Sequence, residues 1–283
     1  MSGFNPHAIV GPGTQPGEAD DAALEYMEMP KGMRTYSAPM LPEPEEARGV
    51  GPALAILAQV RAAVLAQGID QSGCSIDITD LDAENRAFLD QALGDGEVSI
   101  VAGARIQAQE SVFAGVWRVQ EFGHTGGVAF DAIEIGAFPA RVLDVAQQAT
   151  LEGTRSHRGA LPAGVVNAAA LATEIDDKLA AHRSGADAHV INLTLLPLSE
   201  EDVAFLDQRL GPGSVTVLSR GYGNCRISST GTRNAWWVCY FNSRDVVVLN
   251  TIEIVDVPSV ACAAPEDLSD SAQRIGEILE VYQ

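Results

Sequence analysis

Residues 82–100 read DAENRAFLDQALGDGEVSI, and residues 199–217 read SEEDVAFLDQRLGPGSVTV. The five residues from Ala87 to Gln91 recur unchanged from Ala204 to Gln208, 117 residues further along the chain. Both stretches then continue as Leu-Gly-x-Gly. Self-similarity of this kind is interpreted before any other pattern, because it decides how many folding units a chain contains.

The match continues downstream of these stretches. Trp117 corresponds to Trp236, and the run Ile133-Glu134-Ile135 corresponds to Ile252-Glu253-Ile254, each 119 residues later. Two copies are too few for a solenoid, which needs at least about three repeats to bury a continuous core. The sequence therefore predicts one domain that occurs twice.

Each copy predicts helix, strand and helix followed by antiparallel strands, which is an α+β pattern. We expect two tandem homologous α+β domains, the first over 50–149 and the second, with a C-terminal helix, over 167–283. Residues 150–166 are polar and rich in Gly, and we interpret them as a linker. Residues 1–49 hold seven of the fourteen prolines and all five methionines, which predicts an extended N-terminal arm.

Local signals mark several boundaries within the copies. Asp82 is expected to cap a helix that ends at Gly94. Single long strands are expected over 105–122 and over 225–241. The tail from Pro265 to Tyr282 predicts an amphipathic helix with one apolar stripe.

The charge balance excludes some partners. The chain has 38 acids against 18 bases, a net charge of −20. Nucleic-acid binding depends on basic patches, so we expect no nucleic-acid partner. Solubility explains an acidic surface, and a basic protein segment is the partner that such a surface would attract. No run approaches the ~18 apolar residues that span a bilayer, and the N-terminus lacks a signal-peptide pattern. We expect a cytoplasmic protein without a membrane partner.

The residues that carry chemistry are scattered. The four cysteines, Cys74, Cys225, Cys239 and Cys262, fit neither a CxxC motif nor a zinc spacing. The five histidines show no i, i+3 or i, i+4 pairing. We therefore predict no catalytic residue, no metal site and no cofactor, and we do not expect an enzyme.

One position breaks the internal repeat with an aromatic residue. Trp237 stands where the first copy has Arg118, and strand alternation points it away from the face that Trp236 fills. Outward Trp and Arg side chains are enriched in interfaces, whereas the alternative is that Trp237 packs against the other copy or the C-terminal helix. Methionines of the arm suit an adaptable binding surface, or the arm simply lies on its own domain. The predicted partner-binding residues are Tyr222, Arg233, Trp237, Met27, Met29 and Met33.

Several strings carry a family likeness over essentially the whole chain. These strings are GPGTQP at 11–16, LGDGEVSI at 93–100, GVWRV at 115–119, INLTLLPLSEED at 191–202, LGPGSV at 210–215, RGYG at 220–223 and AAPEDLSDSAQR at 263–274. With them the chain resembles the HupH/HyaF/HoxQ group of hydrogenase expression/formation proteins.

This resemblance implies a cytoplasmic accessory factor for maturation of an uptake nickel–iron hydrogenase, typically an oxygen-tolerant one. It implies action on the iron–sulfur small-subunit precursor before twin-arginine export, together with a thioredoxin-like accessory protein. The resemblance transfers no catalytic residue. Two functions stay open: a chaperone that holds the immature subunit, or a catalyst or carrier that handles its iron–sulfur cluster or thiols. A carrier needs clustered thiolates, so the scattered cysteines favour the chaperone.

Overall fold

The computed structural model describes residues 36, 39, 41–44, 49–66, 74–221 and 224–282. The first copy begins with a helix, a strand and a second helix, and it continues with four strands and a short helix. Its elements are α1 (Gly51–Ala66), β1 (Cys74–Asp77), α2 (Ala83–Leu93), β2 (Val98–Ala102), β3 (Ile106–Glu110), β4 (Val116–Phe122), β5 (Val128–Ile135) and α3 (Ala140–Gln147).

The second copy repeats this order, with a short 3-10 helix after its first strand and another after its last. Its elements are α4 (Ala168–Ala181), β6 (His189–Asn192), η1 (Leu193–Leu195), α5 (Glu200–Leu210), β7 (Pro212–Ser219), β8 (Asn224–Thr230), β9 (Ala235–Phe241), β10 (Val247–Ile254), η2 (Ser259–Ala261) and α6 (Pro265–Val281). The predicted duplication and the α+β class are confirmed at this level.

The two copies share one sheet, which the sequence did not predict. Within the described residues, ten strands form one antiparallel sheet in the order β1-β5-β4-β3-β2-β7-β8-β9-β10-β6. The second half of this order is the mirror of the first when β6 to β10 are matched to β1 to β5. The copies are therefore two halves of a pseudo-symmetric sheet rather than two separate sheets.

The symmetry axis passes through the junction of β2 and β7. In this pair Ile100 lies opposite Val217, which is its own counterpart in the second copy. Both side chains are fully buried. Apolar strands that pair with their own equivalents close the sheet at its centre without leaving two edges there.

The expected long strands over 105–122 and 225–241 were wrong, because each is a hairpin. The first turns at Gly115, with φ 75°, and the second turns at the equivalent Asn234, with φ 58°. Both values lie in the left-handed region that Gly and Asn tolerate best. The chain therefore reverses where it was expected to run straight.

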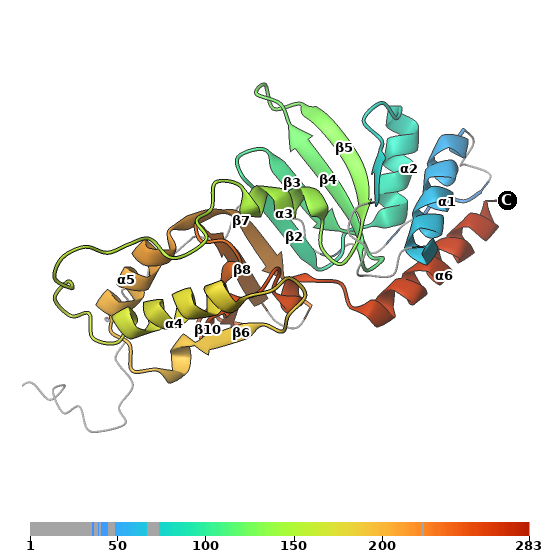
Figure 1. Ribbon diagram of the computed structural model, residues 1–283. Coiled ribbons are helices and arrows are strands. Elements are labelled where there is room, and N and C mark those ends of the chain that lie inside the picture. The colour runs from blue at the N-terminus through green and yellow to red at the C-terminus, as the bar shows by residue number, and fades with distance from the viewer. Residues whose placement is uncertain are drawn as a thin grey trace, which may run out of the picture. The chain divides into compact units, whose positions relative to one another are not determined.

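Helices cover one face of the sheet at each end. In Figure 1, α1 and α2 lie beside the strands of the first copy, and α4 and α5 lie beside those of the second. Asp82 accepts a hydrogen bond from the Asn85 backbone N–H at 3.0 Å and begins α2, as predicted, and Gly94 ends it.

The C-terminal helix α6 packs on the first copy, although it follows the last strand of the second. Leu268, Ala272 and Ile275 of its apolar stripe are buried against α1 and α2. Figure 1 shows α6 running alongside α1. The chain thus returns to its first half, and Arg61 Nε of α1 donates to the Ala272 carbonyl at 3.3 Å.

The opposite face holds a core that both copies build together. Trp117 and Trp236 are both buried in it, beside α3 and η2. The Trp117 indole donates to the Gly136 carbonyl at 2.9 Å, and the Trp236 indole donates to the Asp256 carbonyl at 3.2 Å. The two tryptophans occupy like environments, as the duplication predicted.

The segments outside the two copies make defined contacts where the structure describes them. Leu151, from the predicted linker, exchanges backbone hydrogen bonds with Gly231 and Arg233 at 2.9 and 2.8 Å. In the predicted arm, the Pro42 carbonyl accepts a hydrogen bond from the Tyr282 hydroxyl at 2.5 Å.

Candidate functional site

The predicted partner-binding residues divide into described and undescribed ones. Tyr222, Met27, Met29 and Met33 lie outside the described residues. Arg233 lies in the turn between β8 and β9, where its guanidinium donates to Gln147 Oε1 at 3.0 Å and faces Glu152 at 3.9 Å. Its side chain is 41% exposed, so it remains accessible to a partner.

Trp237 is held by its own copy. It lies on β9, opposite in direction to Trp236, as alternation predicted. The ring is half-buried against the cluster that α4 and α5 form with the sheet, and the indole N–H donates to Asn250 Oδ1 at 2.5 Å. Neither of the packing partners considered from the sequence, the other copy and the C-terminal helix, is needed to explain this contact. Its role in binding stays a prediction.

The equivalent place in the first copy explains why Trp237 has no Trp counterpart. Arg118 stands there, and it binds Asp131 through Nε and, at 2.6 Å, through Nη2. Asp131 is fully buried and also accepts from Arg86 Nη1 at 3.1 Å. Asp131 and Asn250 are counterparts, so the carboxylate and guanidinium of the first copy correspond to an amide and an indole in the second. The break in the repeat therefore has a structural reason.

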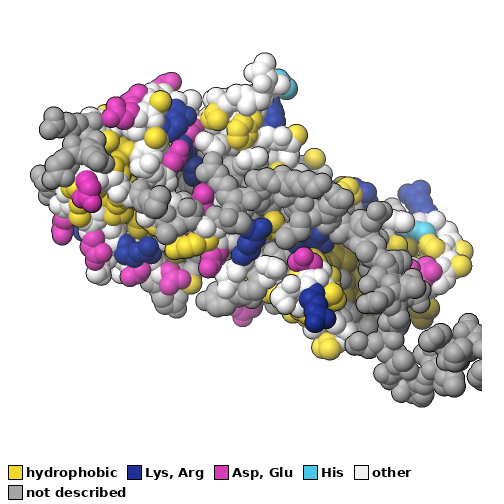
Figure 2. Space-filling view, turned by 180° about the vertical axis from the view of Figure 1, so that it is seen from behind, with side chains coloured by type: hydrophobic (Ala, Val, Ile, Leu, Met, Phe, Trp, Pro, Cys, Tyr) yellow, Lys and Arg dark blue, Asp and Glu magenta, His cyan; other side chains and the backbone are white. Residues whose placement is uncertain are grey.

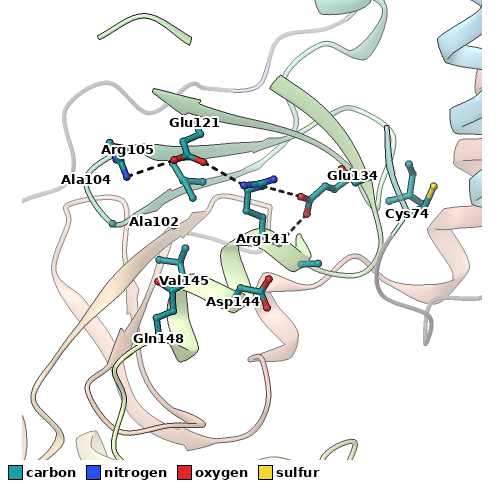
Figure 3. A pocket seen from close by; sticks show the side chains of 15 residues that line it. Cys74, Ala102, Ala104, Arg105, Glu121, Glu134, Arg141, Asp144, Val145 and Gln148 are labelled. Atoms are coloured by element: carbon teal, nitrogen blue, oxygen red, sulfur yellow. Dashed lines mark hydrogen bonds and ion pairs between the residues drawn. The ribbon is translucent and has the colours of Figure 1, made fainter. Parts of the chain in front are cut away.

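A cavity of about 610 Å³ lies in the first copy, between the sheet and α3. Cavities that bind small molecules or side chains fall in this range of volume. Figure 3 shows Arg141 lying between Glu121 and Glu134. The lining also includes Cys74, Arg105, Asp144 and Gln148.

Four charged side chains of this cavity, those of Arg105, Glu121, Glu134 and Arg141, are paired with one another. Arg141 Nη1 lies 3.4 Å from Glu121 Oε2, and its guanidinium also stacks on the Phe130 ring at 4.0 Å. Glu134 is buried and accepts from the Arg141 backbone N–H at 3.2 Å, so it caps the first turn of α3. Burial raises the pKa of Glu134, although Arg141 acts in the opposite direction. The arrangement offers salt-bridged polar groups to a ligand, not a nucleophile beside a base.

Sequence reasoning recognised Glu134 as a repeated acid but missed the cavity. Arg141 comes from α3, an eight-residue helix whose place in the second copy is taken by the three-residue η2. Tyr240 and Glu253 stand where the first copy has Glu121 and Glu134. Comparison of the two copies identified Glu134, because it has a glutamate counterpart. It did not identify Arg141, the ion-pair partner of Glu134.

Two of the four cysteines, Cys225 and Cys239, are buried, and the other two are half-buried. Burial raises the pKa of Cys225 to about 12 and that of Cys262 to about 11, and it also raises the pKa of Cys239. A thiol attacks or binds metal as its thiolate, so these three groups are poor nucleophiles and poor ligands near neutral pH. Cys74 is half-buried on β1 and lines the cavity.

Two structural features are absent from the described residues. No group of three or more His, Cys, Asp or Glu side chains in that part of the chain is arranged to hold a metal ion. None of its helices combines the length and the apolar character that crossing a bilayer requires.

Exposed apolar and acidic side chains mark two places on the surface. Leu195 and Leu196, which follow β6, are exposed, and so is the run Val246 to Val248 at the start of β10. Acidic residues are frequent on α6, where Asp270 and Glu277 are exposed, and Figure 2 shows acids gathered toward the end that carries α1 and α6. The sequence signal for the apolar site was the Val-Val-Val run at the start of a strand.

Comparison with known proteins identifies the family. The model of the HupH hydrogenase expression protein C-terminal conserved region matches twice, over residues 50–157 and 165–282. The hydrogenase expression/formation protein HupH of Rhodobacter capsulatus is 50% identical over 100% of both chains. HoxQ of Cupriavidus necator, also a hydrogenase expression/formation protein, is 46% identical over 97% of this chain and 96% of its own.

More distant relatives extend the same family. The hydrogenase-1 operon protein HyaF of Escherichia coli is 32% identical over 96% of this chain and 95% of its own. A solved structure of the hydrogenase expression protein HupH from Thiobacillus denitrificans is 29% identical, with a TM-score of 0.36, over 40% of this chain and 93% of that chain. With two matches to the family model and close relatives along its full length, this chain belongs to the HupH/HoxQ/HyaF family of hydrogenase expression/formation proteins.

Proposed function

We propose that this protein is a cytoplasmic chaperone for maturation of an uptake nickel–iron hydrogenase, an oxygen-tolerant one, and that it binds the iron–sulfur small-subunit precursor before export. The full-length relatives are named hydrogenase expression/formation proteins, which supports a role in hydrogenase maturation. A thioredoxin-like accessory protein is the proposed second partner. The protein holds its client and does not transform it.

The state of the thiols is the observation that favours the chaperone over a carrier. A protein that transfers a cluster or exchanges disulfides presents thiolates at a surface. Here Cys225 and Cys239 are buried, and burial raises the pKa of each. Cys262 is half-buried, and desolvation raises its pKa as well, so three of the four thiols stay protonated near neutral pH. Cys74 is the thiol on which the carrier alternative would depend.

The acidic surface supports binding of a basic segment. The chain carries a net charge of −20. Helix α6 carries exposed acids, and Figure 2 shows acidic side chains gathered toward the end of the molecule that holds α1 and α6. Long-range attraction speeds association with a client of opposite charge and weakens as salt screens it. Association with the precursor is therefore expected to slow as ionic strength rises.

The test is co-purification of the tagged full-length protein with defined hydrogenase subunits from an anaerobically grown native host. The small-subunit precursor is expected to co-purify, whereas its exported mature form and the large subunit are not. Absence of the precursor from a stable, folded bait would contradict the proposal.

A variant that lacks thiols separates the chaperone from the carrier. Replacing all four cysteines by alanine, with Cys74→Ala alone as the matched control, is expected to leave hydrogenase maturation intact in cells. The melting temperature of the purified variant checks that it folds. Loss of maturation in a stably folded Cys74→Ala protein would favour the carrier.

A further inference from the structure

Strand β10 is only half covered on its outer side. It pairs with β9 from Val247 to Ile254, whereas the edge strand β6 pairs with it only from Thr251 to Ile254. At Asn250 the outward backbone N–H reaches the Thr194 hydroxyl at 2.8 Å, and η1 then leads the chain away to α5. On this outer side, no strand among the described residues pairs with the segment from Val247 to Leu249. Such a free edge is a template for pairing with another chain.

Large exposed apolar side chains lie at the start of β10 and at η1, the short helix that contacts β10. Leu195 is 79% exposed and Leu196 38%, and Val246, Val247 and Val248 are 57%, 46% and 53% exposed. We call these five residues the apolar edge. Exposed apolar side chains occur singly on any surface, but contiguous groups of them mark interaction sites.

The first copy shows that the fold does not require these side chains. Thr79 accepts from the Asp131 backbone N–H at 3.0 Å, as Thr194 does from Asn250, and β1 likewise covers only the second half of β5. The residues at the places of the apolar edge are Asp80, Leu81, Gly127, Val128 and Ala129. Of these, Val128 is a large apolar residue that is exposed, at 41%. The two copies thus share this backbone arrangement but differ in its side chains. The first copy has an acidic residue and small residues at several of these positions, and the second copy has large apolar residues.

The chemistry of the edge selects its occupant. An outward strand edge binds an extended segment through backbone hydrogen bonds, and apolar neighbours select apolar side chains on that segment. A second copy of this chain is disfavoured because two molecules of net charge −20 repel each other. A segment with basic residues around its apolar part would instead be attracted.

We propose that the apolar edge of the second copy binds an extended apolar segment with basic flanks, which adds to β10 as a strand. This inference rests on the proposed function, because it takes the small-subunit precursor as the protein that provides the segment. The corresponding edge of the first copy does not bind it. The pseudo-symmetric sheet therefore has one client-binding end.

Matched substitutions at equivalent positions test this proposal. Val247 and Val128 are counterparts. Val247 is the first residue of β10 and Val128 the first of β5, and each side chain is close to half exposed. Val247→Lys is expected to weaken binding of the purified precursor to the full-length protein about tenfold, the size of a moderate interface hot spot. Val128→Lys adds the same charge and is expected to leave affinity within about twofold. Leu195→Asp installs the first copy's residue and is expected to act like Val247→Lys.

Hydrogen exchange supplies a readout that does not depend on a variant. The backbone amides from Val247 to Leu249 are expected to exchange quickly in the free wild-type protein and more slowly with the precursor bound. The amides around Val128 are expected not to change. This measurement keeps the proposal testable if Val247→Lys fails to fold.

Each contrary result has a distinct meaning. If the precursor binds wild type but Val247→Lys and Leu195→Asp bind equally well, the inference is wrong and the proposed function stands. Equal weakening by Val247→Lys and Val128→Lys would show a net-charge effect and overturn it. A dimer in sedimentation that Val247→Lys dissociates would replace the client by a second copy. If wild type binds no precursor, the proposed function fails and the inference fails with it.

Discussion

Among the described residues, each copy of the repeat buries one aspartate completely, but the two copies bury it in different places. In the first copy Asp131 lies on the sheet between two arginines, and its counterpart in the second copy is the neutral Asn250. In the second copy Asp202 lies at the N-terminus of α4, and its counterpart in the first copy is the neutral Asn85. Asp131, Asp202 and Asn85 are buried.

The two copies share one backbone fold, so equivalent residues occupy equivalent places. Whether such a place holds a charged or a neutral side chain depends on the groups that surround it. Asp131 is tolerated because Arg118 and Arg86 neutralise it. In the second copy, where Trp237 stands in place of the arginine, the amide of Asn250 stands in place of the acid and accepts the indole N–H. A buried charge without its partner costs several kcal/mol, so the two changes must occur together.

The same rule applies to the helix caps. Asn85 Oδ1 accepts one backbone N–H, from Ala53 at the start of α1, at 2.9 Å. Asp202 Oδ1 accepts three, from Val166, Asn167 and Ala168, at 2.8, 2.9 and 2.9 Å. A helix N-terminus carries partial positive charge, so it can neutralise a carboxylate as arginines do.

Removing the sheet carboxylate is expected to have the largest effect on stability. Asp131→Ala removes the carboxylate that Arg86 and Arg118 share and leaves Arg118 only its ion pair with the half-exposed Asp90, so it is expected to lower the free energy of unfolding by about 3–5 kcal/mol. Asn250→Ala removes only the acceptor of a neutral hydrogen bond and is expected to cost about 1–2 kcal/mol. Urea unfolding at neutral pH measures both variants. Equal losses would mean that the charged and neutral networks stabilise the two copies alike.

A half-buried acid, Glu110, also distinguishes the copies, through its effect on stability as pH changes. Glu110 on β3 has Ser229 as its counterpart, and burial, with Glu97 and Asp267 nearby, raises the Glu110 pKa from 4.5 to about 7. The carboxyl is protonated in both states at low pH. Between pH 4.5 and 7 the unfolded chain loses the proton first, so stability falls as pH rises, by at most about 3 kcal/mol.

Glu110→Gln removes this contribution and is the matched variant. Its free energy of unfolding, measured from pH 4.5 to 8, is expected to exceed that of wild type increasingly up to pH 7 and then by a constant amount. Glu134 and Glu253, whose pKa values burial also raises, titrate in both proteins and cancel in the difference. Parallel pH profiles of variant and wild type would contradict the raised pKa of Glu110.

The indole that replaces an arginine provides the next test. Trp237→Ala removes a half-buried ring from the cluster with α4 and α5 and is expected to cost about 2 kcal/mol, below the 3–5 kcal/mol of a fully buried aromatic. Trp237→Phe retains most of the packing and is the control. If Trp237 also contacts the client, affinity of the folded fraction for the precursor falls in the alanine variant. Unchanged stability with reduced affinity would assign it to the interface alone.

The internal repeat made much of each copy predictable from the sequence. Identical runs such as Ala87 to Gln91 located the middle helices, and Asp82 and Gly94 marked the ends of the first one. Counterpart tryptophans identified core positions because duplication keeps what packing requires. The apolar stripe of α6 was also correct.

What the sequence did not show is how the copies are joined. Pairing of Ile100 with Val217 is non-local, and no local propensity specifies it. For the same reason the stripe on α6 could be recognised, but not its partner α1 in the other copy. The hairpin turns were missed although Gly115 and Asn234, both residues that tolerate positive φ, stand at equivalent positions.

The candidate sites were less predictable because each depends on where the copies differ. Arg141 has no counterpart arginine, so the cavity could not be found by internal matching. Trp237 attracted notice because it breaks the repeat, yet its contact with Asn250 requires a partner thirteen residues away on another strand. Departures from the repeat identify candidates, and the structure then assigns them to packing or to binding.

Exchange of the helix caps is expected to have the smallest effect and tests the comparison most finely. Asp202→Asn keeps an oxygen for the three N–H groups of α4 but removes its charge, and it is expected to cost about 1 kcal/mol near neutral pH. Although burial opposes ionisation, hydrogen bonds from Ala168 and its neighbours lower the Asp202 pKa. The stabilisation by the Asp202 carboxylate is therefore complete above the pKa of this group in the unfolded chain and is lost as pH falls through its pKa in the folded protein. The stability of Asp202→Asn should thus approach that of wild type in acid.

The reverse exchange, Asn85→Asp, places a carboxylate beside one N–H of α1 and close to Asp82, and it is expected to destabilise the protein. If Asn85→Asp instead stabilises the protein, the N-terminus of α1 outweighs the repulsion from Asp82. The helix terminus alone would then explain where a carboxylate can be buried.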